Sequence, residues 1–187
     1  MQINILLMRK LTMEELNRKT VDEFKESEKN PVIAVLENIR SAYNVGSVFR
    51  TADAFLIESI FITGYTARPP HKEIAKTALG AQGSVNWEYF ETTKDAVEDL
   101  KKNSYKVYAV EQVTDSISLG NLADLNIEKI AFIFGNEVTG VDERIISLCD
   151  GCIEIPQFGM KHSLNISVAA GIVLWEAIKM NKLSKRI

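Results

Sequence analysis

Short runs of apolar, often β-branched residues alternate along most of this chain with segments whose apolar residues recur at helical spacing. The runs predict buried strands, and the helically spaced segments predict helices that cover them. Strands are predicted at residues 31–36, 59–63, 84–90, 105–111, 130–134 and 152–155. Helices are predicted at residues 45–55, 71–79, 93–102, 142–149 and 165–182. Strands that alternate with helices predict an α/β fold with a mostly parallel sheet flanked by helices.

The segment before the first predicted strand has a different pattern. It is rich in Glu and Lys and predicts an N-terminal helical appendage (residues 1–30) in front of one main domain (residues 31–187). The chain, at 187 residues, is long enough for one domain with a substantial core. Because Met8 and Met13 are alternative start positions, it stays open whether residues 1–7 belong to the native protein.

The last predicted helix is apolar around nearly its whole circumference. Its apolar residues are Ile166, Val168, Ala169, Ala170, Ile172, Val173, Leu174 and Trp175. A helix that is apolar all round is buried on all sides. In a protein with one main domain this favours a homodimer in which the partner covers the helix, and a central core helix is the alternative.

Hydropathy gives no sign of a membrane protein. No apolar run reaches the roughly 18 residues that would indicate a membrane span. The apolar start is too short for a signal peptide, and its basic residues Arg9 and Lys10 follow the apolar stretch instead of preceding it. We therefore expect a cytoplasmic protein with no membrane partner.

The net charge of −3 counts mildly against a nucleic-acid-binding protein, which usually has a basic surface. Local charge matters more than the sum, however. Basic residues gather near the N-terminus and are spread along the first half of the chain, at Arg9, Lys10, Arg18, Lys19, Arg40, Arg50, Arg68, Lys72 and Lys76. On charge alone, an ordinary solvated surface is the favoured interpretation.

Two predicted strand ends carry small or polar residues. The glycine-rich segment from Gly135 to Gly140 follows the strand at 130–134, and Ser163 opens the last helix shortly after Ile155. In an open parallel sheet, ligands bind outside the carboxyl ends of the strands. These segments therefore predict a small-molecule pocket, although the glycine spacing matches neither a dinucleotide fingerprint nor a P-loop.

The sequence contains no metal-site pattern. Cys149 and Cys152 have C-x-x-C spacing, but a zinc site needs two more ligands and no second pair exists. The pair lies between a helix and the next strand, the reverse of the thioredoxin order, so two buried inert thiols are the favoured interpretation. His71 and His162 are the only histidines, and no metal is expected.

A third segment combines a helix start with an arginine. Asn44 is a suitable N-cap, and Gly46 and Ser47 would let an anion approach the first helical turn. Arg50 lies further along the same helix among apolar residues. For Arg50 by itself, a functional role and a side chain that merely extends past apolar residues into solvent are about equally favoured.

Taken together, these segments resemble the TrmH-type branch of the SPOUT RNA methyltransferases. The resemblance covers roughly residues 31–180 and rests on three motifs in the family order and spacing. They are Asn44-Val45-Gly46-Ser47-Val48-Phe49-Arg50-Thr51-Ala52, Phe134-Gly135-Asn136-Glu137-Val138-Thr139-Gly140, and Ile155-Pro156 with Ser163-Leu164-Asn165-Ile166-Ser167-Val168-Ala169-Ala170. Each motif is weak alone, whereas the ordered triple is highly specific. Residues 76–81 are also family-like.

The resemblance implies a SPOUT fold with a C-terminal trefoil knot, S-adenosylmethionine as cofactor, an obligate homodimer and methylation of RNA at the ribose 2'-hydroxyl. By position, it implies catalytic roles for Arg50, Asn44, Glu137, Ser163 and Asn165. It implies cofactor binding by Ala109, Val110, Glu111, Phe134, Gly135, Asn136, Ile155, Pro156, Ser163 and Leu164.

The chemistry of these residue types is consistent with the implied reaction. A guanidinium group stays protonated in proteins, so Arg50 is expected to bind a phosphate and stabilise developing alkoxide charge instead of accepting a proton. Ser163 and Asn165 would orient the hydroxyl. The acidic composition favours a structured RNA read by shape, with tRNA ahead of rRNA. The alternatives are a non-catalytic knotted RNA-binding or assembly protein and a methyltransferase for small molecules or proteins.

Many relatives in this family carry an N-terminal RNA-binding domain, whereas this chain has only the short prefix before residue 31. RNA is therefore expected to bind the dimer surface, with Arg40 and the basic residues near the N-terminus as candidate contacts. The sequence leaves open which nucleotide is methylated. It also leaves open whether Arg50 of one protomer serves its own cofactor or that of the partner.

Overall fold

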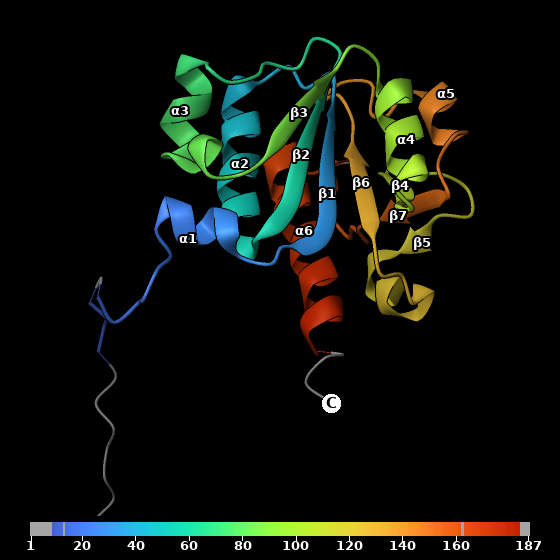
Figure 1. The fold of residues 1–187 in the computed structure, drawn as a ribbon. Coiled ribbons are helices and arrows are strands. Elements are labelled where there is room, and N and C mark those ends of the chain that lie inside the picture. Colours follow the sequence, from blue (N-terminus) through green and yellow to red (C-terminus); the bar gives the residue numbers. More distant parts are fainter. Residues whose placement is uncertain (1–8, 13, 162, 184–187) are drawn as a thin grey trace, which may run out of the picture.

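In the residues that the computed structural model describes, a parallel sheet of seven strands with helices on both faces forms the body of the protein (Figure 1). The model describes residues 9–12, 14–161 and 163–183. The strand order is β3-β2-β1-β6-β4-β7-β5, and all six neighbouring pairs run parallel. The prediction of an α/β fold with a mostly parallel sheet is confirmed.

The elements follow the predicted alternation closely. The strands are β1 (Asn30–Glu37), β2 (Ile57–Thr63), β3 (Trp87–Phe90), β4 (Lys106–Val110), β5 (Ile117–Ser118), β6 (Ile130–Phe134) and β7 (Gly151–Glu154). The α-helices are α1 (Val21–Glu26), α2 (Ala42–Phe55), α3 (Lys72–Ala78), α4 (Thr93–Lys102), α5 (Glu143–Ile146) and α6 (Ile166–Leu183). The 3-10 helices of the described residues are η1 (Ala81–Gly83) and η2 (Leu119–Leu125).

The alternating side chains of the central strands create two separate hydrophobic layers. Val32 and Leu36 of β1 point to the face covered by α2, α3, α6 and η2. Ile33 and Val35 point to the opposite face, which α4 and α5 cover. Because both faces are buried, the strands read as nearly continuous apolar runs, and this explains why they were recognisable in the sequence.

The described part of the segment before β1 is helical only over a short stretch. Among its described residues only Val21–Glu26 is α-helical, and a capping box between Thr20 and Glu23 starts that short helix. Phe24 is buried in the main hydrophobic core, so the end of this segment packs on the body of the protein. The abundance of Glu and Lys indicated a solvated segment, but it provided no apolar stripe to hold a longer helix in place.

Several boundaries also differ from the prediction. Ser41, not Asn44, is the N-cap of α2, and Thr92, not Thr93, caps α4. Thr93 is buried instead, and its hydroxyl lies 2.7 Å from that of Thr63. Residues 84–86, expected in a strand, lie between η1 and β3, and β5 and η2 were missed because each is too short to show a period.

Gly46 lets α2 pack closely against α3. A Cβ atom added at Gly46 would lie 2.1 Å from Thr77 Oγ1 and 2.4 Å from the carbonyl oxygen of Ile74. The Thr77 hydroxyl also donates a hydrogen bond of 2.9 Å to the carbonyl of Tyr43. The predicted role of Gly46 in admitting an anion is therefore wrong, because the space beside it is filled by α3.

The last helix has one exposed apolar face. Ala170, Val173 and Leu174 are fully buried, whereas Val168 and Trp175 remain 49% and 55% exposed. The prediction that this helix is covered on all sides is thus not met within one chain. None of the helices in the described part of the chain is long and apolar enough to cross a membrane.

Replacement of Gly46 by alanine should destabilise the protein by about 1–3 kcal/mol, because the added methyl group overlaps α3. Gly83→Ala is the matched control, since a Cβ atom there would meet no atom within 4 Å. Denaturant unfolding of both variants tests this expectation. Equal stability of Gly46→Ala and the wild type would contradict the close packing described for α2 and α3.

Candidate active site

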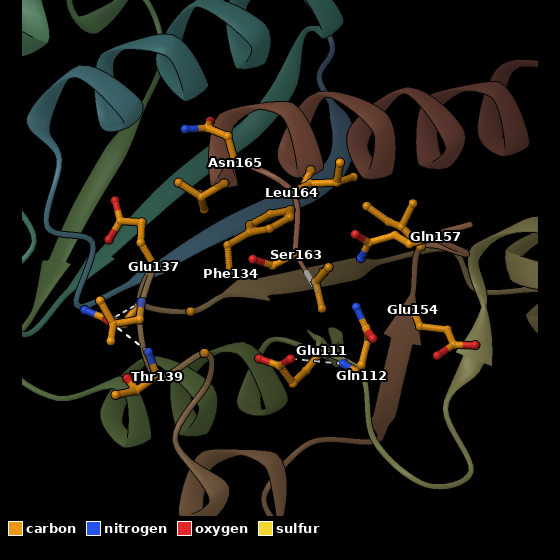
Figure 2. Close-up of a pocket in the computed structure, with 18 of the residues that line it drawn as sticks. Glu111, Gln112, Phe134, Glu137, Thr139, Glu154, Gln157, Ser163, Leu164 and Asn165 are labelled. Atoms are coloured by element: carbon orange, nitrogen blue, oxygen red, sulfur yellow. Dashed lines mark hydrogen bonds between the residues drawn. The ribbon is translucent and has the colours of Figure 1, made fainter. Parts of the chain in front are cut away.

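A cavity of about 530 Å³ opens at the carboxyl ends of β4, β6 and β7 (Figure 2). This size is within the range of small-molecule sites. The lining residues are Val110, Glu111, Gln112, Phe134, Gly135, Asn136, Glu137, Val138, Thr139, Gly140, Ile153, Glu154, Ile155, Gln157, Ser163, Leu164, Asn165, Ile166 and Ala169. The prediction of a pocket between the strand end at 134 and the segment around Ile155 and Ser163 is confirmed.

The loop after β6 is folded tightly on itself. Asn136 and Gly140 exchange two backbone hydrogen bonds of 3.1 and 2.9 Å. A Cβ atom at Gly135 would lie 2.2 Å from the backbone of Gly140 and Val141. Gly140 has a φ of +70°, which favours glycine. The two glycines of this motif are therefore required by the backbone geometry of the loop.

The side chain of Asn136 holds this loop against the rest of the sheet. Its Oδ1 accepts hydrogen bonds from the amides of Val138 and Thr139, at 2.8 and 3.2 Å. Its Nδ2 donates to the carbonyl of Asn38 at 2.8 Å and to the hydroxyl of Tyr65 at 2.6 Å. Asn136 is buried, and all four hydrogen bonds expected of a buried amide are made.

Glu137 connects the loop after β6 to the start of α2. Its carboxylate accepts hydrogen bonds from the amides of Arg40 and Ser41, at 2.9 and 3.2 Å, and from Nδ2 of Asn44 at 3.0 Å. Desolvation raises the pKa of Glu137, but these hydrogen bonds outweigh it, so that the pKa is lowered below its usual value. The carboxylate is thus held in its charged form.

The same chain of hydrogen bonds continues to the last helix. Oδ1 of Asn44 accepts a hydrogen bond of 3.2 Å from Nδ2 of Asn165. Oδ1 of Asn165 in turn accepts from the amide and hydroxyl of Ser167, at 2.9 and 2.7 Å, which caps the first turn of α6. Glu137, Asn44 and Asn165, one from each sequence motif, therefore lie in one network.

The cavity carries negative charge. Glu111, Glu137 and Glu154 line it, and the described lining residues include no Lys, Arg or His. Glu111 is fixed in place, because its carboxylate accepts hydrogen bonds from the amides of Gln112 and Val141, at 3.0 and 3.1 Å. Phe134, Ile153, Ile155, Leu164 and Ile166 add apolar surface. Such a site suits a ligand that combines a positive charge with an apolar ring.

Most of the residues predicted to bind a cofactor line this cavity. They are Val110, Glu111, Phe134, Gly135, Asn136, Ile155, Ser163 and Leu164. Ala109 instead lies fully buried in the sheet, and Pro156 is exposed, and neither lines the cavity. Ala109 was predicted wrongly because it lies inside β4, which ends only at Val110.

Of the five predicted catalytic residues, Glu137, Ser163 and Asn165 line the cavity and Asn44 is bonded to two of them. Arg50 lies elsewhere. Its side chain is exposed on α2 and lines a second cavity of about 570 Å³ with Lys76 of α3 and Ser167 of α6. Within one chain, the structure therefore does not bring Arg50 into the first cavity.

Sequence reasoning missed several lining residues. Gln112, Glu154 and Gln157 follow or end the strands β4 and β7, and their side chains border the cavity (Figure 2). Val138 and Thr139 lie in the predicted motif itself. Gln112 lies one residue beyond the predicted Glu111, and Glu154, the last residue of β7, lies one residue before the predicted Ile155. The carboxyl-end rule would have found both if it had included the residue on either side of those predicted.

The two cysteines make no metal site in the described part of the chain. Cys152 is buried and Cys149 is partly buried, and neither is in a disulfide bond. Burial raises the pKa of Cys149 to about 12, so its thiol stays protonated at neutral pH. The described residues contain no group of three or more His, Cys, Asp or Glu side chains suited to hold a metal ion.

Solved structures share this architecture. The chain superimposes on the crystal structure of the Aquifex aeolicus TrmH/SpoU tRNA modifying enzyme with a TM-score of 0.77 and 24% identity, covering 88% of this chain and 82% of that one. It also matches the AdoMet-bound rRNA methyltransferase from Sinorhizobium meliloti with a TM-score of 0.74 and 25% identity, covering 80% of this chain and 56% of that one.

Known protein sequences are also similar to this chain. The chain is 31% identical over 168 residues to a tRNA (guanosine(18)-2'-O)-methyltransferase of Thermus thermophilus, covering 87% of this chain and 82% of the relative. The model of the SpoU rRNA Methylase family matches residues 31–175, which include all three motifs. The resemblance to TrmH-type RNA methyltransferases, inferred from those motifs, is thereby confirmed. This chain belongs to the SpoU rRNA methylase family.

Proposed function

We propose that this protein transfers a methyl group from S-adenosylmethionine to a ribose 2'-hydroxyl of RNA, with tRNA as the preferred substrate ahead of rRNA. The observation that carries the proposal is the hydrogen-bond network of Glu137, Asn44 and Asn165 beside an acidic cavity. Membership of the family supports the reaction, and the Thermus relative named as a tRNA methyltransferase supports the choice of RNA.

The residues of the first cavity suit S-adenosylmethionine. Its sulfonium group is positive, and Glu111, Glu137 and Glu154 supply compensating negative charge. Apolar side chains such as Ile155 and Leu164 offer surface for its adenine ring, as in other small-molecule sites. When bound, this cofactor would supply an activated methyl group for an in-line displacement.

The side chains around the network suit the acceptor ribose. Ser163 and Asn165 lie at the cavity, and they can hold the 2'-hydroxyl by hydrogen bonds while Glu137 and Asn44 keep Asn165 in place. Alignment of the two reacting groups accounts for much of the rate in such a displacement. Ionised Glu137 accepts three hydrogen bonds already, so its role here is positioning instead of proton transfer.

Arg50 would act from the second cavity. Its guanidinium group has no hydrogen-bond or ion-pair partner within the described part of the chain, and it shares the cavity with Lys76 and four hydroxyl-bearing side chains. These groups suit a phosphate of the RNA backbone. Because this cavity is separate from the first one, a dimer in which Arg50 serves the partner's cofactor is the arrangement that we propose.

The exposed face of α6 supports a homodimer. Val168, Ile172 and Trp175 follow each other at helical spacing, and all three remain exposed. Trp175 also packs on Phe55 of α2, with ring centroids 5.7 Å apart, so this face continues toward the second cavity. A partner subunit that covers this face would approach Arg50. The trefoil knot and the division at residue 30 remain predictions.

Transfer of labelled methyl from S-adenosylmethionine to unmodified total tRNA and rRNA tests the proposed function. The label should resist alkali, because a 2'-O-methyl group blocks cleavage of the adjacent linkage, and it should enter tRNA faster than rRNA. Cofactor binding without transfer to any RNA would favour another acceptor. RNA binding without cofactor binding would favour the non-catalytic alternative.

Loss of the Arg50 guanidinium should reduce methyl transfer while leaving cofactor binding intact. We expect Arg50→Ala to lower kcat by about 100-fold or more, because one charged contact to the developing negative charge is lost. Arg50→Lys should recover only part of the rate, since an ammonium group cannot make the bidentate contact. Near-normal turnover of Arg50→Lys would contradict a specific guanidinium role.

Removal of the Glu137 charge should loosen the connection between α2 and the loop after β6. Glu137→Gln should reduce methyl transfer by up to about 100-fold through misplacement of Asn44 and Asn165. The pKa of folded Glu137 is lowered from its usual 4.5, so its carboxylate stabilises the folded state above pH ~4.5. That stabilisation is lost as the pH falls through the folded pKa.

Free energies of unfolding, measured from neutral to acidic pH, test whether the carboxylate of Glu137 stabilises the folded state. The wild type should exceed Glu137→Gln in stability at neutral pH, and the difference should shrink as the pH falls below 4.5 through the lowered pKa of folded Glu137. A difference that stays constant with pH would show that the charge of Glu137 is not what stabilises the connection.

A charge on the exposed face of α6 should separate the proposed dimer. Ile172→Glu is expected to yield a monomer by light scattering at micromolar concentration, because an unpaired carboxylate would be buried at the interface. Lys94→Glu, an exposed change on α4, serves as the control and should leave the dimer intact. A wild-type protein that is monomeric at this concentration would overturn the dimer.

A further inference from the structure

An exposed aromatic ring stands beside the candidate active site. Tyr65 follows β2, and its side chain is 65% exposed to solvent. Its hydroxyl accepts a hydrogen bond of 2.6 Å from Nδ2 of Asn136, a residue that lines the acidic cavity. The ring therefore lies at the edge of the cavity that borders the loop after β6.

The ring is also held rigidly. The amide of Tyr65 donates to Oδ1 of Asn38 at 3.2 Å, and the neighbouring Thr66 is buried. The Thr66 hydroxyl donates to the carbonyl of Leu36 at 3.0 Å and accepts from the amide of Ile39 at 2.8 Å. Both ends of the Tyr65 side chain are thus fixed, so little conformational entropy would be lost when a ligand contacts the exposed ring.

One arginine is connected to the Tyr65 segment through a second tyrosine. Arg68, three residues further along, lies with its guanidinium carbon 3.8 Å from the centroid of the Tyr89 ring. The Tyr89 hydroxyl donates to the carbonyl of Gly64, next to Tyr65, at 3.1 Å. In the described part of the chain, neither Arg68 nor Arg40 forms an ion pair.

An aromatic ring and unpaired arginines are the groups that proteins use for unpaired nucleotides. Every nucleobase has a flat face that stacks on an aromatic side chain, while arginine contacts the adjoining phosphate. A protein partner would more often meet such a ring within a wider apolar patch. Here the contacts of Tyr65 are polar, because its amide and hydroxyl are hydrogen-bonded to Asn38 and Asn136.

We propose that Tyr65 is a stacking platform for an unpaired base of the RNA substrate, next to the target nucleotide, and that Arg68 contacts its phosphate. This inference rests on the proposed function, because it deepens the account of how the RNA is held. The platform would explain how a chain with a net charge of −3 binds RNA, since stacking supplies affinity that does not depend on overall charge.

Two substitutions separate stacking from the hydrogen bond to Asn136. Tyr65→Phe keeps the ring and removes the hydroxyl, whereas Tyr65→Leu removes both. We expect Tyr65→Leu to raise the KM for tRNA by about tenfold and to leave kcat and the Kd for S-adenosylmethionine near the wild-type values. Tyr65→Phe should keep a KM near that of the wild type. Arg68→Ala should raise the KM less and reduce its dependence on salt.

Filter binding of tRNA, measured without cofactor, makes the test independent of turnover. We expect Tyr65→Phe to bind tRNA about as tightly as the wild type and Tyr65→Leu to bind it more weakly. If the wild type and variants bound tRNA with this order of affinities but the wild type transferred no methyl group, the proposed function would be wrong and stacking by Tyr65 would be supported. If methyl transfer were normal and Tyr65→Leu bound as well as the wild type, the platform alone would fail.

Two other outcomes also overturn the platform. Equal losses in Tyr65→Phe and Tyr65→Leu, together with weaker cofactor binding, would show that Tyr65 acts only by holding Asn136 in place. A change of oligomeric state in Tyr65→Leu, detected by light scattering, would show that the ring contacts a second copy of the chain instead of RNA.

Discussion

The carboxylate of Glu137 is the interaction on which the arrangement of this site depends. It accepts hydrogen bonds from two backbone amides before α2 and from the side chain of Asn44, and so joins the loop after β6 to a helix almost a hundred residues earlier. Through Asn44 the same network reaches Asn165 at the start of α6. Three segments that are remote in sequence thereby have one fixed geometry.

The sheet makes this network possible. Because β1 and β6 are parallel neighbours, with Leu36 opposite Phe134, their carboxyl ends place Glu137 beside the residues that follow β1. β4 and β7 end at the same edge and contribute Glu111 and Glu154 to the cavity. The tight turn at Gly135 and Gly140 then directs the loop back over this edge, which encloses the space for a ligand.

Charge is divided between two parts of the surface. The first cavity is acidic, which suits a positively charged methyl donor, whereas Arg50, Lys76 and Arg68, which form no ion pair among the described residues, lie outside it. RNA and cofactor would therefore be attracted to different parts of one site. This division accounts for an RNA methyltransferase family member whose net charge is negative.

The sequence predicted the elements whose apolar pattern is long, and most of the cavity residues that lie near strand ends. β6 and the motif around Gly135 were found because a buried strand and a tight turn leave local patterns. The position of Arg50 could not be predicted, because it depends on how α2 packs against α3 and α6, which no local pattern shows. Tyr65 was missed because only tertiary structure brings it to Asn136.

Amide hydrogen exchange with and without S-adenosylmethionine tests the central claim most directly. If the cavity is the cofactor site and Glu137 joins it to α2, the cofactor should slow exchange in residues 134–141, 153–157 and 163–166. It should also slow exchange in residues 40–44, which the cofactor need not touch, because the network through Glu137 would transmit the ordering. Protection confined to other parts of the chain, or protection of the cavity without residues 40–44, would contradict the account.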